Sequence, residues 1–240
     1  MSAVVPFPRR RRPAPASRPA RAPRGRASSA EATRGRLLER ARQVFSERGY
    51  VRTTVSDVVA GTGLSRGAFY RYFESVDAIF VETIGSVIDE LVAASKVHDG
   101  RTQRERVRAG NRRYLEIFAK HGGVMRALAE AAFVDPDIQA IQARLRGAYL
   151  RRLRDHLRRQ CALGRCHPLD PDAATLALGM MVEGVAMSWL VTGLEPFERP
   201  LEIERVCTQV TDLWCRAVYL EPDRVLGPPR RPAGPRDAAR

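Results

Sequence analysis

The residues with the clearest chemistry lie at positions 65–73, where arginine, tyrosine and phenylalanine recur at helical spacing. At 100° per residue, most aromatic positions share one side of a short helix and the arginines share the other. Guanidinium and phenol groups donate hydrogen bonds to base edges and phosphates, so the arginine side predicts a surface that enters a DNA groove. This side carries Arg66, Gly67, Tyr70 and Arg71, and the opposite side carries Phe69, Tyr72 and Phe73.

A second short helix and a glycine turn precede this segment. Thr54 stands three residues before Asp57, the spacing of a capping box that starts a helix. Gly63 lies in the turn, where glycine adopts positive φ at little cost, and Ser65 can cap the next helix. Two short helices joined by a tight turn predict a helix-turn-helix, which places its second helix in the major groove. An amphipathic helix with a solvated face is the alternative, but the capped first helix and the turn weigh against it.

Between the two ends of the chain, the residue pattern predicts helices and no strands. An apolar face recurs at helical spacing over positions 31–48 and ends at Gly49. Further helices are predicted at 76–95, 101–120, 123–133, 136–162, 171–193 and 199–220, punctuated by prolines. We therefore predict an all-α protein.

The positive charge of the chain is concentrated at its ends. The net charge is +14, of which residues 1–30 contribute +8, residues 223–240 contribute +3, and residues 31–222 contribute +3. Both ends are rich in proline, alanine or glycine and have few large apolar side chains, which predicts disorder. A basic arm attracts phosphates or anionic lipid, and a tail that merely aids solubility is an equal alternative.

Positions 33–80 resemble the TetR family of transcriptional regulators. The matching features are the opening RGRLLERARQVFSERGY, the threonine pair before the first short helix, the glycine turn, the Ser-Arg-Gly start of the second helix and the Phe-Tyr-Arg-Tyr-Phe run. The later helices match the family only in number and order. The resemblance implies an all-helical homodimer that regulates transcription, usually as a repressor that a small molecule releases from DNA.

The resemblance also assigns DNA contacts residue by residue. It implies base-edge contacts from the recognition helix at 65–72 and phosphate contacts from residues around it. The expected partner is double-stranded DNA with a near-palindromic operator, read by two recognition helices about 34–36 Å apart. The DNA-binding candidates are Arg34, Arg52, Thr53, Thr54, Ser65, Arg66, Gly67, Ala68, Tyr70, Arg71 and Tyr72.

Two positions depart from the family pattern. The family often has a lysine that meets a phosphate just after the recognition helix, whereas this chain has Glu74-Ser75-Val76-Asp77. Val59 stands where the family prefers alanine at a close helix crossing. We therefore expect base specificity to differ from that of relatives, and we expect the arginine arm to supply the affinity that the lysine would have given.

The expected domains are a disordered basic arm (1–30), a DNA-binding domain (31–77), a helical ligand-binding and dimerisation domain (78–222) and a disordered tail (223–240). Residues 173–194 are almost wholly apolar, with Glu183 as their one charge. Their length would admit a transmembrane helix, but the central charge and the missing aromatic belt weigh against a membrane. We expect instead a homodimer formed through the 171–193 and 199–220 helices.

The residue pattern does not show where a ligand cavity lies. Methionine and aromatic side chains in the later helices would suit a small apolar ligand, although plain core packing is favoured for each one taken singly. The ligand-binding candidates are Tyr114, Phe118, Met125, Phe133, Tyr149, Met180 and Trp189.

Other chemistry has weaker support. Cys161, Cys166 and His167 lie close together, but the spacing matches no common structural zinc pattern, so we expect ordinary thiols and neither a metal nor another cofactor. We find no nucleophile triad, phosphate loop or suggestive carboxylate pair, so we expect no enzyme. With no export signal in the sequence, we expect a cytoplasmic protein.

The rival function is an arginine-tailed architectural or nucleoid DNA-binding protein with little sequence preference.

Overall fold

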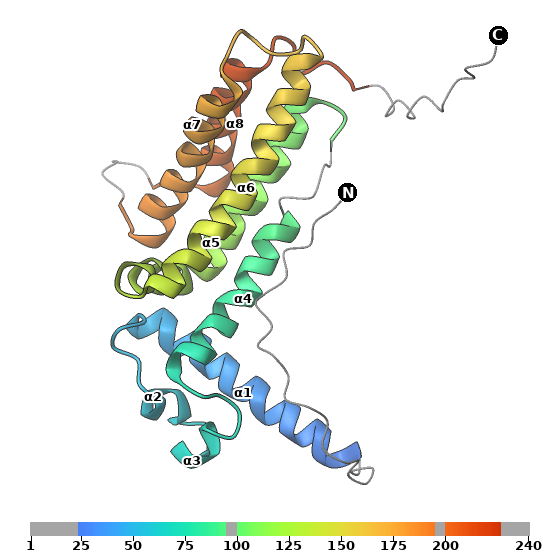
Figure 1. Ribbon diagram of the computed structural model, residues 1–240. Coiled ribbons are helices and arrows are strands. Elements are labelled where there is room, and N and C mark those ends of the chain that lie inside the picture. The colour runs from blue at the N-terminus through green and yellow to red at the C-terminus, as the bar shows by residue number, and fades with distance from the viewer. Residues whose placement is uncertain (1–23, 95–99, 195–199, 227–240) are drawn as a thin grey trace, which may run out of the picture.

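The computed structural model describes residues 24–94, 100–194 and 200–226, with side chains from residue 29 onward (Figure 1). Within these ranges every regular element is a helix, which confirms the predicted all-α class. Figure 1 shows α1, α2 and α3 at one end of the molecule, α5 to α8 side by side at the other, and α4 leading between them. The helices are α1 (Arg24–Arg48), α2 (Val55–Val59), α3 (Arg66–Phe69), α4 (Val76–Ala94), α5 (Gln103–Val134), α6 (Pro136–Ala162), α7 (Pro171–Val185), the π-helical η1 (Ala186–Val191) and α8 (Ile203–Val218).

A small aromatic and aliphatic core holds α1 to α4 together. Phe45 of α1 packs edge-on against Phe80 of α4 with ring centroids 4.7 Å apart, and the Tyr50 ring lies 4.7 Å from the same ring. Val58 of α2 and Phe69 of α3 are fully buried in this core. Helices as short as α2 and α3 are unstable alone, so this burial sets their position and angle.

The described structure extends into both segments that were predicted to be disordered, 1–30 and 223–240. α1 begins at Arg24, so residues 24–30 are helical where disorder was predicted. This stretch follows Pro23 and contains no further proline, so nothing stops α1 from extending toward the N-terminus. At the other end, Asp223 accepts a hydrogen bond from Arg104 (2.6 Å) and the Leu226 N–H donates to a carbonyl before α5 (2.7 Å). Residues 1–23 and 227–240 lie outside the described ranges.

α5 is one helix of 32 residues where two shorter helices were predicted. A kink replaces the expected break, because His121 has φ −117° and ψ 19°. Gly122 and Gly123, which follow His121, allow neighbouring helices to pack closely against α5. A Cβ atom at Gly122 would lie 3.0 Å from the carbonyl oxygen of Leu190, and one at Gly123 would lie 2.6 Å from Ser46 Cβ. α5 therefore touches both η1 and the end of α1 at its kink.

The other helix limits differ little from the predicted ones. α6 begins and ends where predicted, and α4 ends beside residues that are not described. The predicted 171–193 helix is α-helical to Val185 and then π-helical, and α8 begins at Ile203 instead of 199.

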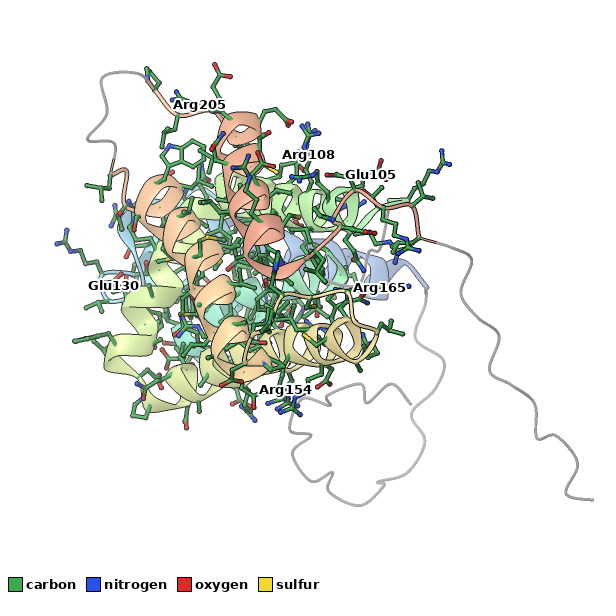
Figure 2. The ribbon with its side chains drawn as sticks, turned by 90° about the horizontal axis from the view of Figure 1, so that it is seen from above. Glu105, Arg108, Glu130, Arg154, Arg165 and Arg205 are labelled. Atoms are coloured by element: carbon green, nitrogen blue, oxygen red, sulfur yellow. The ribbon has the colours of Figure 1, made fainter. Side chains whose placement is uncertain are left out.

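The helices from α5 to α8 form a bundle, called the upper bundle below, with α5 at its centre. α5 packs against α6, α8 and η1 and also against α4. Viewed from above in Figure 2, α7 and α8 lie next to each other, and the labelled Arg108, Arg154 and Arg205 lie at the periphery of the bundle. The buried apolar side chains of this bundle include Leu115, Phe118, Val124, Leu128, Ile138, Leu157, Val182, Val206, Val210, Trp214 and Val218.

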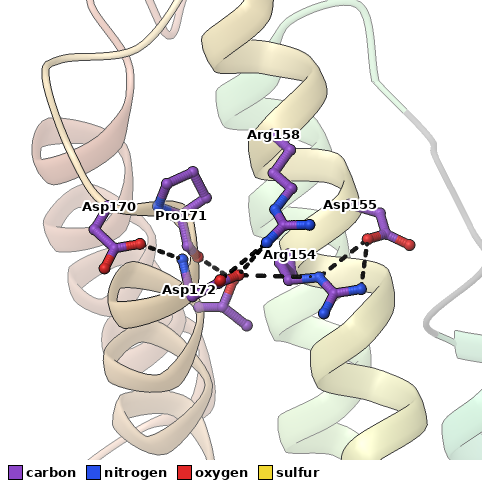
Figure 3. A network of polar contacts seen from close by, with 7 residues as sticks. Arg154, Asp155, Arg158, Asp170, Pro171 and Asp172 are labelled. Carbon is purple, nitrogen blue, oxygen red and sulfur yellow. Dashed lines mark hydrogen bonds and ion pairs between the residues drawn. The ribbon is translucent and has the colours of Figure 1, made fainter.

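Arginine–aspartate contacts join α6 to the start of α7 (Figure 3). Arg158 donates to both carboxylate oxygens of Asp172 at 3.0 and 2.9 Å, and Arg154 lies 4.0 Å from the same carboxylate. Asp170 caps α7 by accepting from the Asp172 backbone N–H at 2.9 Å. Exposed ion pairs contribute about 0–1 kcal/mol each, so these contacts orient α7 more than they stabilise the fold.

Candidate nucleic-acid interface and ligand cavity

Local capping positions the α2–turn–α3 unit. The Asp57 backbone N–H donates to the Thr54 hydroxyl (3.3 Å), and the Thr54 backbone N–H donates to the Asp57 carboxylate (2.9 Å), which completes the predicted capping box. Gly63 has φ +73° in the turn, as predicted. The Ser65 hydroxyl then accepts from the Ala68 N–H at 3.1 Å and starts α3. Each of these caps stabilises its helix by about 1 kcal/mol.

The two sides of α3 differ in exposure as the sequence predicted. Phe69 and Phe73 are buried, whereas the Tyr70 side chain is 55% exposed and the arginines on its side are exposed. The regular helix ends at Phe69, and hydrogen-bonded turns continue it, with the Phe73 N–H donating to the Phe69 carbonyl at 3.1 Å. α3 therefore presents Arg66, Gly67, Tyr70 and Arg71 to solvent.

Three of the predicted contact residues are engaged within the domain. Ala68 is buried, so its methyl group faces the core and not the exposed side of α3. Thr53 is also buried, and its hydroxyl donates to the Gly49 carbonyl at 2.7 Å. Arg34 donates through both terminal nitrogens to Glu82 of α4, and its guanidinium lies 4.9 Å from the centre of the Phe73 ring. The resemblance assigned these three residues to DNA contacts, and it did not separate side chains that face inward from those on the surface.

The other predicted residues are exposed or half-buried. Arg52, Thr54 and Ser65 are exposed, and Tyr72 is half-buried. The Thr54 hydroxyl also donates to Asp57 at 2.6 Å, so its first role in this structure is to start α2.

A set of contacts from α5 to the α1–α2 connection was not found from the sequence. The Glu130 carboxylate accepts from the backbone N–H of Tyr50 at 2.9 Å, and Arg126 donates to the Ser46 carbonyl at 2.8 Å. The Tyr50 hydroxyl donates to Asp77 at 2.7 Å, and burial together with this carboxylate raises the pKa of Tyr50. The partners are separated by 80 residues or more in the two α5 contacts, so no local spacing could have indicated them.

A cavity of about 670 Å³ lies between α4, α5 and α6, with walls completed by α7 and α8. This volume falls within the range of small-molecule sites. Four of the predicted ligand residues line it, namely Tyr114, Phe118, Met125 and Tyr149.

The other three predicted ligand residues do not line this cavity. Phe133 is 93% exposed near the end of α5, and Met180 is 37% exposed on α7. Trp189 is half-buried in η1 and packs against the core. Residue type alone pointed equally to all seven, because aromatic and methionine side chains also occupy surfaces and cores away from a cavity.

Polar residues that were not predicted as ligand contacts also line the cavity. The Tyr114 ring stacks on Phe118 at 4.7 Å and lies 6.3 Å from the Tyr149 ring. Burial, and then the nearby Glu183 carboxylate, raise the pKa of Tyr114 and raise that of Tyr149 to about 12. Both phenols are therefore neutral hydrogen-bonding groups at physiological pH. The further polar lining residues are Gln103, Arg106, Asn111, Gln142, Arg146, Arg152, Asp155, His156, Arg159, Gln160, Glu183, Trp214 and Tyr219.

Two family models match the two halves of this architecture. The model described as bacterial regulatory proteins of the tetR family matches residues 37–83, and the tetracyclin repressor-like C-terminal domain model matches residues 100–193. The chain belongs to the TetR family. The first match contains the α2–turn–α3 unit, and the second contains α5 and α6 with their part of the cavity.

Known relatives agree with this membership. The TetR-family chain is 26% identical over 211 residues to the HTH-type transcriptional regulator EthR of Mycolicibacterium smegmatis, covering 83% of the chain and 93% of that relative. It is 37% identical over 67 residues to the HTH-type transcriptional repressor KstR2 of Mycobacterium tuberculosis, covering 28% of the chain and 34% of that relative. The crystal structure of the TetR-family regulator PfmR from Thermus thermophilus matches with a TM-score of 0.58 at 26% identity, covering 76% and 98% of the two chains. This protein is a DNA-binding transcriptional regulator, and the architectural alternative is not favoured.

The apolar segment of this TetR-family regulator lies within the helical bundle. Pro171–Val191 is long and apolar enough to cross a membrane, and a third of its most apolar window is buried. Its α7 part packs against α6 and α8, and η1 packs against α5. This packing is that of a bundle helix, and membrane crossing has no further support.

The cysteines of the TetR-family regulator are free thiols. Burial, and then a hydrogen bond with Cys161, raise the pKa of Cys166 to about 12, so this thiol stays protonated at physiological pH. His167 is exposed next to it. Across the described residues, no group of three or more histidine, cysteine or acidic side chains is placed to hold a metal ion.

Proposed function

We propose that this regulator is a homodimeric repressor that binds a near-palindromic operator through two copies of α3 and leaves it when a small molecule enters the α5–α6 cavity. The exposed face of α3 carries the proposal, because Arg66, Tyr70 and Arg71 stand out from a helix whose opposite side is buried. Arginine pairs with guanine edges and phosphates, and tyrosine hydroxyls bond phosphates. Arg52 is exposed in the connection between α1 and α2 and would add a further phosphate contact.

The outer faces of α7 and α8 support a dimer formed through these helices. Leu176 and Met180 of α7 are exposed, and so is Leu213 of α8, which is 59% exposed. Small residues continue the α7 face, since Ala173, Ala177 and Gly184 are exposed at helical spacing. A second copy would bury these apolar groups in a four-helix interface with two-fold symmetry. The same symmetry would hold two α3 helices at a fixed distance for adjacent turns of DNA.

The kinked centre of α5 supports a route from the cavity to the DNA-binding end. Phe118 and Met125 line the cavity on either side of the kink. Gly123 packs on Ser46 at the end of α1, and Glu130 holds the connection that follows α1. A ligand that packs against the kink therefore acts on a helix already fastened to α1. Release requires that the ligand bind the DNA-incompetent arrangement more tightly than the competent one.

Selection of bound fragments from random-sequence DNA, followed by sequencing, tests the proposal. We expect an enriched near-palindrome and at least a thousandfold preference over random duplex, as specific regulators show (~10³–10⁷). A matched control uses the protein with Arg66, Tyr70 and Arg71 all replaced by alanine, which should enrich nothing. A specificity ratio near one for the native chain would instead support an architectural role. The proposal also implies a cytoplasmic protein that binds DNA without a cofactor and catalyses no reaction.

A further inference from the structure

The cavity is elongated along α5 and α6. These helices are antiparallel neighbours, since Gln103 near the start of α5 donates to Gln160 near the end of α6 at 2.8 Å. Residues from 142 to 160 of α6 line the cavity, which corresponds to about 27 Å of helix at 1.5 Å per residue. An occupant that fills the cavity must therefore be long.

The end of the cavity far from the DNA-binding helices is rich in arginine. Arg106 of α5 and Arg152 and Arg159 of α6 line it, together with the indole of Trp214. Arg152 is half-buried, and burial is the first cause that lowers its pKa. A guanidinium that has lost part of its hydration favours a nearby negative charge.

The acidic residues of the wall do not balance these arginines. The wall contains four arginines and two carboxylates, which gives +2 with histidine neutral. Both carboxylates are already engaged, since Asp155 accepts from Arg154 at 3.1 Å and Glu183 accepts from Arg146. The wall therefore favours a negatively charged group over a positive one.

The opposite end of the cavity is mainly apolar, although Gln142 of α6 also lines it. Phe118 and Met125 lie here beside the kink of α5, close to the contacts with α1. Burial of hydrocarbon against such a wall stabilises a complex by about 25 cal/mol per Å² of apolar surface. The apolar lining residues of the cavity include Ile88, Leu91, Phe118, Met125, Leu128 and Leu145.

We propose that the cavity binds an elongated amphipathic organic anion of the long-chain carboxylate class. Its negative head lies toward Arg152 and Arg159, and its hydrocarbon part lies toward Phe118 and Met125. This inference rests on the ligand-responsive function proposed above and refines the small apolar ligand expected from the sequence. The head anchors the molecule at the far end, and the tail packs against the kinked part of α5 that contacts α1.

A cationic amphipath is the competing ligand class. Tyr114, Phe118 and Tyr149 present aromatic rings near Glu183, a combination that attracts cations. Arg146, however, places a guanidinium against that carboxylate. The excess of arginine at the far end disfavours a cation further.

Direct binding to the full-length protein tests the ligand class without DNA. The chain has two tryptophans, so Trp189→Phe leaves Trp214 at the arginine-rich end as the single fluorescent reporter. Dodecanoate, dodecan-1-ol and dodecyltrimethylammonium share one tail length and differ in head charge. We expect dodecanoate to bind at least about tenfold more tightly than the other two, the advantage of a charge-assisted hydrogen bond. Equal binding of acid and alcohol, or tighter binding of the ammonium, would overturn the proposal.

Two neighbouring arginines provide a matched pair of variants. Arg152→Gln should weaken dodecanoate binding about tenfold and leave dodecan-1-ol binding unchanged. Arg151→Gln removes an exposed charge beside it that does not line the cavity, and should change neither. If Arg152→Gln does not fold, as judged by circular dichroism, Arg159→Gln takes its place with the same expectation. Equal losses of dodecanoate affinity in Arg151→Gln and in the cavity variant, Arg152→Gln or Arg159→Gln, would refute a specific head-group site.

Release of the selected operator is measured separately. Dodecanoate that binds the cavity but leaves the operator complex intact would support the ligand class and contradict ligand-released repression. Failure of dodecanoate to bind would contradict the ligand class while leaving DNA recognition by α3 unaffected.

Discussion

The DNA-binding end and the cavity of the upper bundle are built in different ways. The caps and the turn of the α2–turn–α3 unit come from one short stretch, in which Thr54 and Ser65 cap helices and Gly63 turns the chain. The cavity wall draws on residues from 88 to 219, contributed by five helices and the segment after α8. The local form of the first site is therefore specified by contacts between near neighbours in the sequence, whereas the whole wall of the second depends on how long helices pack.

The two regions also differ in how their arginines are exposed to solvent. On α3 the arginines are solvated and available to phosphates and bases. In the cavity Arg152 is half-buried beside aromatic and aliphatic side chains, so its charge contributes selectivity for a ligand head group. Arginine therefore serves two proposed kinds of recognition, that of DNA at the surface of α3 and that of a ligand head group inside the cavity.

The largest expected effect is at α3. Arg66→Ala removes a proposed base contact from both subunits of a dimer, and each such contact is worth about 1–3 kcal/mol, so operator affinity should fall about 30-fold or more. Fluorescence anisotropy with the selected operator measures the loss. Arg151→Ala, which removes an exposed arginine from α6, is the control and should bind normally. Equal affinity in the Arg66 variant would remove α3 as the reading helix.

The next largest effect is expected where the kink of α5 contacts the end of α1. Gly123→Ala would place Cβ 2.7 Å from Ser46 Cα and 2.8 Å from the Ser46 carbonyl oxygen, so backbone must move. We expect a loss of about 1–3 kcal/mol in the free energy of unfolding, measured by urea denaturation. Gly85→Ala is the control, since a Cβ there meets no atom within 4 Å and alanine favours a helix by about 1 kcal/mol. Unchanged stability in the Gly123 variant would show that this contact is not tight.

A smaller effect is expected from the α2 cap. Thr54→Ala removes the side-chain half of the capping box and should cost about 1 kcal/mol. Because α2 supports α3, operator binding should weaken while the cavity keeps its affinity for dodecanoate. Thr54→Ser, which retains the hydroxyl, should restore most of the stability. Loss of dodecanoate binding in the alanine variant would contradict the separation of the two regions.

The basic arm provides a test that depends on salt. Residues 1–23 contain six arginines, and their deletion leaves α1 intact. If the arm binds phosphates, the slope of log K against log salt concentration should flatten by about 0.9 for each phosphate that the arm neutralises in the full chain. The deletion variant and the full chain are compared on the selected operator across salt concentrations. An unchanged slope together with unchanged low-salt affinity would assign the arm another role.

The smallest effect concerns alkaline pH and the upper bundle. The pKa of Cys166 is raised to about 12, against about 8.5 for an unperturbed thiol. The folded state therefore keeps its proton at a pH where the unfolded chain has lost it, so stability falls as pH rises through this interval. Cys166→Ser should flatten the decline measured by urea denaturation between about pH 8.5 and 11. An identical decline in the variant would show that this thiol does not couple folding to pH.

The sequence predicted the parts of the structure that depend on neighbours along the chain. Alternation of buried Phe69 and exposed Tyr70 follows from the helical repeat, and the Thr54–Asp57 cap follows from spacing. The pattern did not reveal that Arg34 pairs with Glu82, because that contact joins two helices 48 residues apart. Likewise Phe118 lines the cavity and Phe133 lies at the surface, a difference set by packing around α5 and not by residue type.

Binding to half of the selected near-palindrome tests the central claim most directly. The native chain and the Arg66→Ala variant are titrated onto duplexes with both half-sites intact or with one scrambled. We predict that two native chains bind the intact duplex, that scrambling one half-site removes most of the affinity, and that the variant no longer distinguishes the two duplexes. Equal native affinity for both duplexes, or full discrimination by the Arg66 variant, would contradict operator reading by paired α3 helices.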